Sequence, residues 1–508
     1  MRTIIVGAGS AGSVIASRLT EDARHDVVLV EAGRDYPEAG ERPEVLPDDL
    51  RDGRQNAMHA HDWGYAYRAT AHRFWSALQM GFPRGRVVGG SSAVNTCIAL
   101  RGMPYDYDEW AALGLREWSW EHCLPAFKRL ETDLDIDDEW HGREGPLPIR
   151  RHKPSELVPW QAAFVEACIE LGFPQNPDTN NPTTTGVGPH AMNKIDGQRI
   201  SAARAFLRGS VRARPNLQIK ADTVVRRVKV RDGRVQGIEI ERHGRVSELL
   251  ADRVVLSAGA IATPGILLRS GIGPAAEITR LGITLVQDVP AVGAQLLDHP
   301  GIAIFFLPHE SGMSRVDHPL IQTQCRYAST GGMGPNDMML QPGSFIPIPR
   351  FPVAGVTLAA QVGKSRARGT LRFMSARPGD APVIDSNLLG EEGDRVAVRE
   401  ALMWISRLTK TKAISALAKP IYPRRKPFDD DGNFTGPIQQ ITGSGYHPCG
   451  TVPMGRDDDP AAATDGRGRV RGVEGLIVAD ASLMPTIPSA NTNLASLMIG
   501  ERFGEWLR

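Results

Sequence analysis

The 508-residue sequence predicts an α/β fold in which a domain with a parallel sheet is interrupted by a second, α+β domain built on an antiparallel sheet. Three observations predict it. The chain opens on an apolar strand that runs into a glycine-rich turn, and a second strand follows from Asp26 to Val30. Strand-like and helix-like segments alternate up to about residue 300 and again near the C-terminus. Residues 301–374, in contrast, are rich in strand-like runs.

The opening unit has the pattern G-x-G-x-x-G between a strand and a helix predicted over Ser10–Leu19. Gly7 permits the tight turn, Gly9 leaves room for a pyrophosphate, and Gly12 lets the helix lie close to the strand. The helix N-terminus would then face the phosphates, and Glu31 stands where a carboxylate accepts hydrogen bonds from ribose hydroxyls. A glycine-rich turn that binds nothing is the alternative, which the flanking strands and the acid disfavour. The pattern predicts a Rossmann-like dinucleotide site and leaves FAD and NAD open.

Periodicity and turn residues place the other elements. Helices are expected near residues 106–112, 120–130, 155–171, 395–408 and 494–506. Strands are expected over about 218–230 and 234–240, joined by a hairpin at Asp232-Gly233, and over 253–260, 302–307, 353–362 and 370–374.

Three segments lack such periodicity. Residues 34–83 are rich in Asp, Pro, Gly and His and predict extended surface chain, and residues 420–427 predict a linker. Residues 331–352 predict either a mobile loop over a substrate pocket or an ordinary surface excursion, with equal weight. The predicted nucleotide domain comprises residues 1–100, 200–300 and 440–508, and the predicted substrate-binding domain comprises residues 101–199 and 301–439.

Composition excludes several classes of function. The 59 basic and 58 acidic residues leave a net charge of +1, which gives no electrostatic case for nucleic acid or an anionic membrane. No run of 18 apolar residues predicts a membrane span, and the first strand starts too near Met1 to follow a cleavable signal, so a cytoplasmic location is expected. The 5 cysteines are scattered without a C-x-x-C pair, which argues against a disulfide framework and a metal site.

Three further segments carry a resemblance. Residues 85–95 form a glycine- and serine-rich stretch, GRVVGGSSAVN, without the charge of a solvent loop. Residues 257–274 read SAGAIATPGILLRSGIGP, and residues 447–455, HPCGTVPMG, are followed by 478–485 and 488–493. With the opening motif, these segments resemble the glucose-methanol-choline (GMC) oxidoreductase family along essentially the whole chain. The resemblance implies FAD in the nucleotide domain, over a second domain that shapes the substrate pocket.

The resemblance also bears on how the flavin is held. A subset of that family attaches the flavin through a histidine two residues after the paired serines and just before the asparagine, and this sequence has Val94 there. A histidyl-flavin bond at this site is chemically excluded, so we predict that acid denaturation releases FAD intact into the supernatant. Flavin absorbance that stays with the precipitated protein would contradict this expectation.

His447 is the candidate general base for alcohol oxidation. A histidine suits the task because its ordinary pKa near 6.5 leaves part of it neutral at physiological pH. It stands between Tyr446 and Pro448 in a Gly-rich bend, although a lone histidine is more often structural. Its position matches that of the family's base. His299, in Asp298-His299-Pro300, matches a family structural motif and is not expected to be catalytic.

Asn491, 44 residues after His447, is the candidate partner, because family members place a histidine or asparagine at about this spacing. Its amide could donate a hydrogen bond to a developing alkoxide. The structural alternative is a helix cap before the predicted C-terminal helix, and both roles could coexist. The resemblance implies that the cofactor contacts Gly7, Gly9, Ser10, Ala11, Gly12, Glu31, Ala32, Val88, Gly90, Asn95, Val224, Ala258, Gly259, Asp480, Ala481 and Thr492.

These observations predict FAD-dependent oxidation of a small primary alcohol to an aldehyde, with oxygen or a quinone-like compound as electron acceptor. Candidate substrates are aromatic or pyridine-type alcohols such as pyridoxine, choline-like alcohols and polyols. One alternative is a hydroxynitrile lyase with non-redox FAD. Another is an NAD-binding dehydrogenase or a non-catalytic nucleotide-binding protein.

Overall fold

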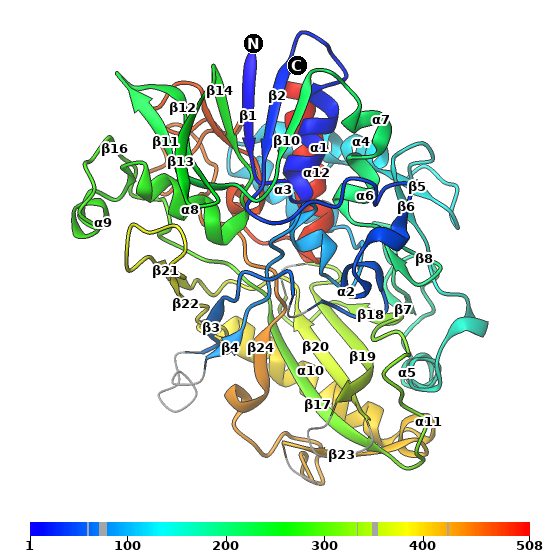
Figure 1. Ribbon diagram of the computed structural model, residues 1–508. Helices are drawn as coiled ribbons and strands as arrows, with labels where there is room; N and C mark the ends of the chain where they lie inside the picture. Colours follow the sequence, from blue (N-terminus) through cyan, green and yellow to red (C-terminus); the bar gives the residue numbers. More distant parts are fainter. Residues whose placement is uncertain (58–59, 71–78, 333, 348–353, 424–425) are drawn as a thin grey trace.

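The computed structural model describes residues 1–57, 60–70, 79–332, 334–347, 354–423 and 426–508, and it confirms the α/β fold. A parallel sheet occupies one end of the molecule and an antiparallel sheet the other, with both chain termini at the parallel-sheet end (Figure 1). Two large hydrophobic clusters correspond to these two parts. None of the helices in the described ranges combines the length and the apolar character needed to cross a bilayer.

The parallel sheet has the strand order β10-β2-β1-β14-β25. Its strands are β1 (Arg2–Val6), β2 (Asp26–Val30), β10 (Leu217–Lys220), β14 (Arg253–Leu256) and β25 (Leu476–Val478). The apolar runs of β1, β2, β14 and β25 reflect burial on both faces, as expected for parallel strands, whereas the edge strand β10 is only partly buried. Helices α1 (Ser10–Leu19) and α12 (Thr492–Trp506) lie side by side against the sheet (Figure 1). An ideal Cβ at Gly500 would lie 2.7 Å from the Ala11 carbonyl oxygen, so a glycine is needed where these helices meet.

A three-stranded antiparallel sheet packs beside the parallel one through contacts between β12 and β14. It contains β11 (Val224–Arg231), β12 (Arg234–Arg242) and β13 (Arg245–Leu250). The predicted hairpin at Asp232-Gly233 is confirmed, because Arg231 pairs with Arg234 and both turn residues have positive φ, as a type I′ turn requires. Helix α8 (Gly259–Arg269) follows β14.

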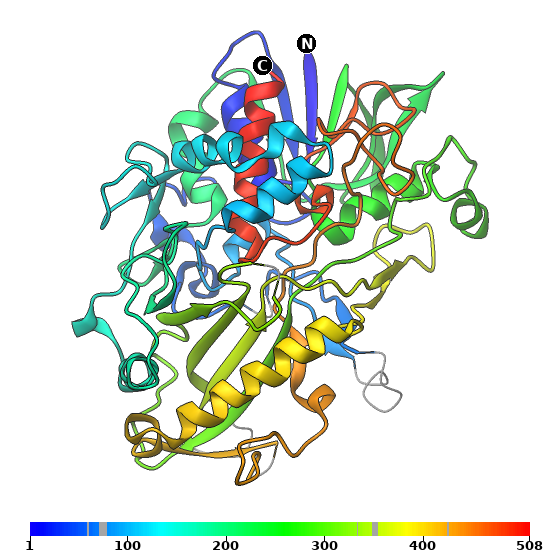
Figure 2. The same cartoon turned by 180° about the vertical axis from the view of Figure 1, so that it is seen from behind.

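The large antiparallel sheet has the order β23-β17-β20-β19-β18-β7, with β24 also paired to β17. Its strands are β7 (Gly186–Pro189), β17 (Pro300–Pro308), β18 (Thr323–Tyr327), β19 (Met338–Pro347), β20 (Ala354–Val362), β23 (Ala418–Tyr422) and β24 (Thr442–Ser444). Helices α5 (Pro159–Glu170) and α10 (Glu392–Lys410) pack on one face of this sheet. Figure 2, seen from behind, shows α10 crossing in front of the strands. The opposite face borders the cavity described below.

The remaining elements are short. The helices are α2 (Asp48–Arg51), α3 (Pro104–Ala112), α4 (Trp120–Leu130), α6 (Ala202–Phe206), α7 (Gly209–Arg212), α9 (Ala275–Arg280) and α11 (Lys412–Ser415). The strands are β3 (Ala66–Arg68), β4 (Met80–Gly81), β5 (Glu131–Asp133), β6 (Leu147–Ile149), β8 (Lys194–Ile195), β9 (Gln198–Arg199), β15 (Ile272–Gly273), β16 (Gln287–Asp288), β21 (Thr370–Arg372) and β22 (Val383–Asp385). The predicted helices are confirmed, with α1 and α4 at the predicted bounds and the others shifted by a few residues.

Three predicted strands differ from the structure. The strand expected over 253–260 ends at Leu256, since helix α8 begins at Gly259. The strand expected over 218–230 is two strands in different sheets, β10 and β11. The chain turns between them because Asp222 and Thr223 donate their backbone N–H groups to Gly33 and Glu31 carbonyls, with Asp222 at a φ of 51°. The strand expected over 370–374 ends at Arg372 and belongs to a separate sheet, β21-β22-β3-β4.

The segments predicted to lack regular structure also need correction. The expected loop 331–352 contains β19, an interior strand of the large sheet, whereas residues 333 and 348–352 lie outside the described residues. Gly343 looks like a strand breaker, but an ideal Cβ there would lie 2.4 Å from Thr357 Oγ1, so packing requires the glycine. The expected linker 420–427 begins in β23. The expected surface chain 34–83 includes α2, β3 and β4 and buries Leu50, Tyr67 and Phe82.

Candidate active site

A cavity of about 900 Å³ runs from the carboxyl ends of the parallel strands to the antiparallel sheet. Ligands of α/β proteins bind at this edge of the parallel sheet. The cavity is lined by both predicted catalytic residues and by most of the predicted cofactor residues, namely Gly7, Gly9, Ser10, Ala11, Glu31, Ala32, Gly90, Asn95, Val224, Ala258, Gly259, Asp480, Ala481 and Thr492. Gly12 and Val88 do not line it. Val88 is buried and donates its N–H to the Arg34 carbonyl.

The glycines of the opening motif have different physical roles. Gly7 has a φ of 99°, and an ideal Cβ at Gly12 would lie 1.9 Å from the Gly7 carbonyl oxygen, so the protein itself needs both. An ideal Cβ at Gly9, however, would meet no protein atom closer than 3.8 Å. Because Gly9 lines the cavity, a side chain there would project toward a bound ligand. This is the cradle that a pyrophosphate requires, and the fold therefore fits FAD at this end.

Glu31 is held at the end of β2 by backbone donors. Its two carboxylate oxygens accept hydrogen bonds from the N–H groups of Ala8 and Gly33, each at 2.9 Å. Burial raises the pKa of Glu31 to about 7, against the lowering effect of these hydrogen bonds. The fixed orientation leaves further lone pairs for a ribose hydroxyl.

Asp480 follows β25 and is buried. Its carboxylate accepts hydrogen bonds from Gly259 N at 2.8 Å, from Thr263 Oγ1 at 2.6 Å, and from the N–H and hydroxyl groups of Ser482. These contacts join the start of α8 to the segment after β25. The residue therefore shapes this end of the cavity through its bonds to the protein.

His447 lies in the bend after β24 and is 8 % exposed. The backbone N–H of His447 donates to Asp298 Oδ1 at 2.9 Å, and the preceding residue, Tyr446, has a φ of 65°. Burial, with the nearby His299 and Arg84, lowers the pKa of His447 well below the ordinary value. The imidazole is therefore neutral at physiological pH, the state in which it can accept a proton.

The tautomer of His447 follows from its neighbour His299, which is also neutral because burial lowers its pKa to about 4. His299 Nε2 lies 2.9 Å from the Gly363 carbonyl and 3.0 Å from the Pro488 carbonyl, so it carries the proton. His299 Nδ1 is then an acceptor, and it lies 2.9 Å from His447 Nδ1. The Gln361 amide is farther from that atom, at 3.4 Å. His447 therefore donates from Nδ1, and its Nε2 is the acceptor atom of the ring.

Asn491 completes this arrangement. Its Nδ2 lies 2.9 Å from His447 Nε2, and both residues line the cavity. The helix begins directly after Asn491 as expected, but the side chain makes no cap hydrogen bond. Its Oδ1 has no hydrogen-bond partner among the described residues, although it is shielded from solvent. The pair offers an acceptor and an amide donor side by side, which is the combination that a hydroxyl group needs.

The sequence predicted no catalytic role for His299, and it gave no sign that His299 contacts His447. The structure brings the two rings together across 148 residues of chain. Only the D-H-P sequence pointed to His299, and a local motif does not reveal such a distant contact.

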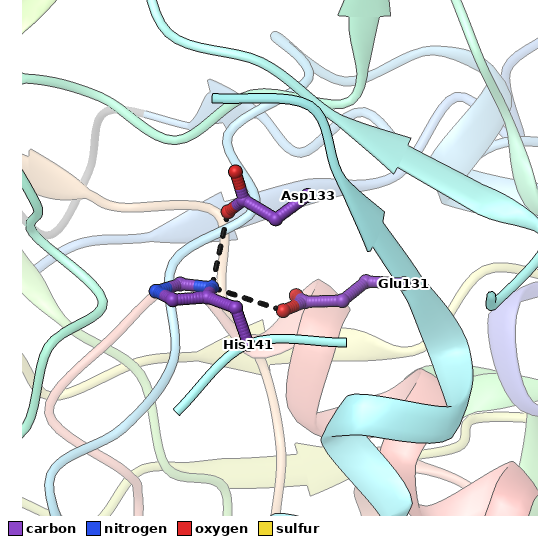
Figure 3. A group of neighbouring side chains, drawn as sticks. All are labelled: Glu131, Asp133 and His141. Atoms are coloured by element: carbon purple, nitrogen blue, oxygen red, sulfur yellow. Dashed lines mark hydrogen bonds and ion pairs between the residues drawn. The ribbon is translucent and has the colours of Figure 1, made fainter. Parts of the chain in front are cut away.

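A group of acidic side chains with a histidine lies apart from this cavity (Figure 3). Glu131, Asp133 and His141 face one another and are buried. Arg101 pairs with Glu131, and Arg151 pairs with Asp133 at 2.8 Å. Burial lowers the pKa of His141, but hydrogen bonds to Asp133, Asp178 and Glu131 outweigh this effect and raise the pKa to about 10. The carboxylates are neutralised by these cations, so the group is a structural ion network rather than a metal site.

Known proteins resemble this chain over nearly its whole length. The family model described as GMC oxidoreductase matches residues 1–301 with its N-terminal part and residues 365–500 with its C-terminal part. The chain is similar to 5-(hydroxymethyl)furfural oxidase of Methylovorus sp. (strain MP688), at 34% identity over 99% of this chain and 97% of the relative. It is also similar to oxygen-dependent choline dehydrogenase of Brucella anthropi, at 34% identity over 98% of this chain and 94% of the relative. The crystal structure of pyridoxine 4-oxidase from Mesorbium loti superposes with a TM-score of 0.89, at 30% identity, covering 99% of this chain and 98% of that one.

Proposed function

Because the chain belongs to the GMC oxidoreductase family, we propose that it oxidises a small aromatic primary alcohol to the aldehyde at the cavity end that holds His447 and Asn491. It is an FAD-dependent enzyme that acts on CH–OH donors. The observation that carries the proposal is the acceptor atom His447 Nε2 at the cavity wall, which pairs with the Asn491 amide at 2.9 Å and would pair with a substrate hydroxyl in its place.

Each side chain of this group has a task in the proposed reaction. His447 Nε2 accepts the hydroxyl proton of the alcohol, and the Asn491 Nδ2 amide donates a hydrogen bond to the oxygen as negative charge develops on it. His299 keeps the proton of His447 on Nδ1, so that Nε2 stays available. FAD, when bound, supplies the acceptor for the hydride that leaves the carbinol carbon. Gly7, Gly9, Glu31 and Asp480 would hold its dinucleotide part.

The walls near His447 favour an aromatic substrate over a cationic one. Gly301, Ala303 and Ala359 line the cavity from the antiparallel sheet, where their small side chains leave a flat surface. The carboxylates that line the cavity in the described residues are at the end of β2, after β25, and at Asp380 between β21 and β22. None comes from the antiparallel sheet or from residues 439–448, so this end offers no counter-charge for a choline-like cation. The names of two relatives, 5-(hydroxymethyl)furfural oxidase and pyridoxine 4-oxidase, refer to heteroaromatic alcohols.

An alcohol panel tests the proposal. Under anaerobic conditions, we expect benzyl alcohol and 5-(hydroxymethyl)furfural to bleach the flavin absorbance, and choline to do so at least about tenfold less efficiently, because one missing charge contact is worth ~1–2 kcal/mol. Admission of air then tests oxygen as the acceptor, which we propose because relatives are named oxidases. If the flavin stays oxidised with every alcohol while the protein cleaves a cyanohydrin, the result would instead support the lyase alternative.

A further inference from the structure

The cavity face of the antiparallel sheet is defined by strand register. Gln341 of β19 pairs with Ala359 of β20, which pairs with Ala303 of β17. All three side chains line the cavity. Their sequence neighbours Leu340, Leu358 and Ile304 pack into the core on the opposite face, as the alternation of strand side chains requires. A row of one amide and two methyl groups therefore borders the cavity.

The next row along the strands leads to the candidate base. Met339 pairs with Gln361, which pairs with Gly301. The Gln361 amide lies 3.4 Å from His447 Nδ1. Gln341 and Gln361 are diagonal neighbours on the two strands, which places their backbones roughly 7–8 Å apart. The row that holds Gln341 therefore lies next to the row that contacts His447.

The Gln341 amide has an unusual environment. Its Oε1 is shielded from solvent and has no hydrogen-bond partner among the described residues, and the residue lines the cavity. The buried ring of His190 lies next to this side chain, and neither of its nitrogens reaches a partner within 3.5 Å in the described part of the chain. Burial lowers the pKa of His190 to about 3, and the Gln341 side chain opposes that shift. A neutral imidazole keeps one N–H, and the Gln341 oxygen is the acceptor beside it.

We propose that Gln341, turned by His190 so that its Nε2 points into the cavity, selects planar aromatic alcohols that carry a hydrogen-bond acceptor across the ring from the carbinol group. The inference rests on the proposed function and specifies its substrate class. The acceptor is a carbonyl, a carboxylate, a phenolate or a ring nitrogen, each of which accepts a hydrogen bond from an amide N–H. The floor of Gly301, Ala303 and Ala359 supports the ring between the two ends.

The test compares two matched substrate pairs in two proteins. 5-(Hydroxymethyl)furfural is compared with furfuryl alcohol, and 4-(hydroxymethyl)benzaldehyde with 4-methylbenzyl alcohol. In the wild-type protein, we expect kcat/KM to favour the carbonyl-bearing alcohol, and in Gln341→Leu we expect this preference to fall by roughly tenfold, mainly through KM. The electronic effect of the substituent is the same in both proteins, so the change in the ratio isolates the contact. Thr357→Val is the matched control, because Thr357 is on the same strand as Ala359 but does not line the cavity.

The outcomes separate the two proposals. An unchanged preference in Gln341→Leu, or an equal fall in Thr357→Val, would overturn the role of Gln341 and leave alcohol oxidation intact. Failure of every alcohol to reduce the flavin would overturn both proposals. If Gln341→Leu does not fold, the wild-type protein still decides, because 4-methylbenzaldehyde should perturb the flavin spectrum at a roughly tenfold lower concentration than p-xylene. Equal binding of the two compounds would reject the proposal.

Discussion

Replacing His447 by alanine is expected to slow alcohol-driven reduction of the bound flavin by at least about a hundredfold, the usual effect of removing a general base. FAD should remain bound, because the residues that would contact its dinucleotide part lie on other elements. The measurement is anaerobic stopped-flow absorbance with benzyl alcohol. His309→Ala is the matched control, since His309 is exposed and its ring bonds only to the Ser415 carbonyl in the described structure. Reduction at the wild-type rate in His447→Ala would remove this residue from the mechanism.

The pH dependence of the wild-type rate bears on the same assignment. A base acts in its neutral form, which predominates above its pKa, and burial lowers the pKa of His447 below the ordinary value near 6.5. Lowering the pH from 8 to about 6.5 should therefore not slow flavin reduction through protonation of His447. The activity that depends on this residue should be lost only at lower pH.

Replacing Gly9 by valine is expected to leave a folded protein that has lost most of its flavin. The nearest protein atom to an ideal Cβ at Gly9 is 3.8 Å away, so the fold can accommodate a side chain there. A bound pyrophosphate, in contrast, would collide with that side chain. Overpacking of this kind costs ~1–3 kcal/mol, a roughly tenfold to hundredfold loss of FAD affinity. The measurement is the FAD content of the purified protein together with its thermal unfolding.

The control for this change is Gly393→Val, since Gly393 is exposed on α10 with no atom within 4 Å of an ideal Cβ. That variant should keep its FAD. A Gly9→Val protein with the full flavin content would show that the motif does not contact the pyrophosphate.

Local sequence rules predicted the elements whose conformation depends on local interactions. The helix Ser10–Leu19 and the hairpin at Asp232-Gly233 follow from a glycine-rich turn and from two residues that tolerate positive φ. The break between β10 and β11 was not predicted, because Asp222 and Thr223 turn through hydrogen bonds to the distant residues Gly33 and Glu31. Strand β19 was missed because its glycine and proline resemble breakers until Thr357 packs against Gly343.

The candidate site shows the same division. The resemblance to the GMC family predicted that His447 and Asn491 belong together, and the structure places Asn491 Nδ2 2.9 Å from His447 Nε2. The proton state of His447, in contrast, depends on His299 and on the two carbonyl groups that His299 contacts. These contacts join four distant parts of the chain, so no local pattern encodes them. The catalytic roles and the domain boundaries remain proposals.

We propose that a neutral His447 beside Asn491 accepts the hydroxyl proton of an alcohol. FAD would accept the hydride from the carbinol carbon of that alcohol. The most direct test mixes the purified holoenzyme with benzyl alcohol and with its α,α-dideuterated form in the absence of oxygen and follows the flavin absorbance together with the aldehyde. We expect the flavin absorbance to bleach in a one-to-one ratio with the benzaldehyde formed, and to bleach more slowly with the deuterated alcohol. Flavin that stays oxidised, or bleaching without any aldehyde, would contradict it.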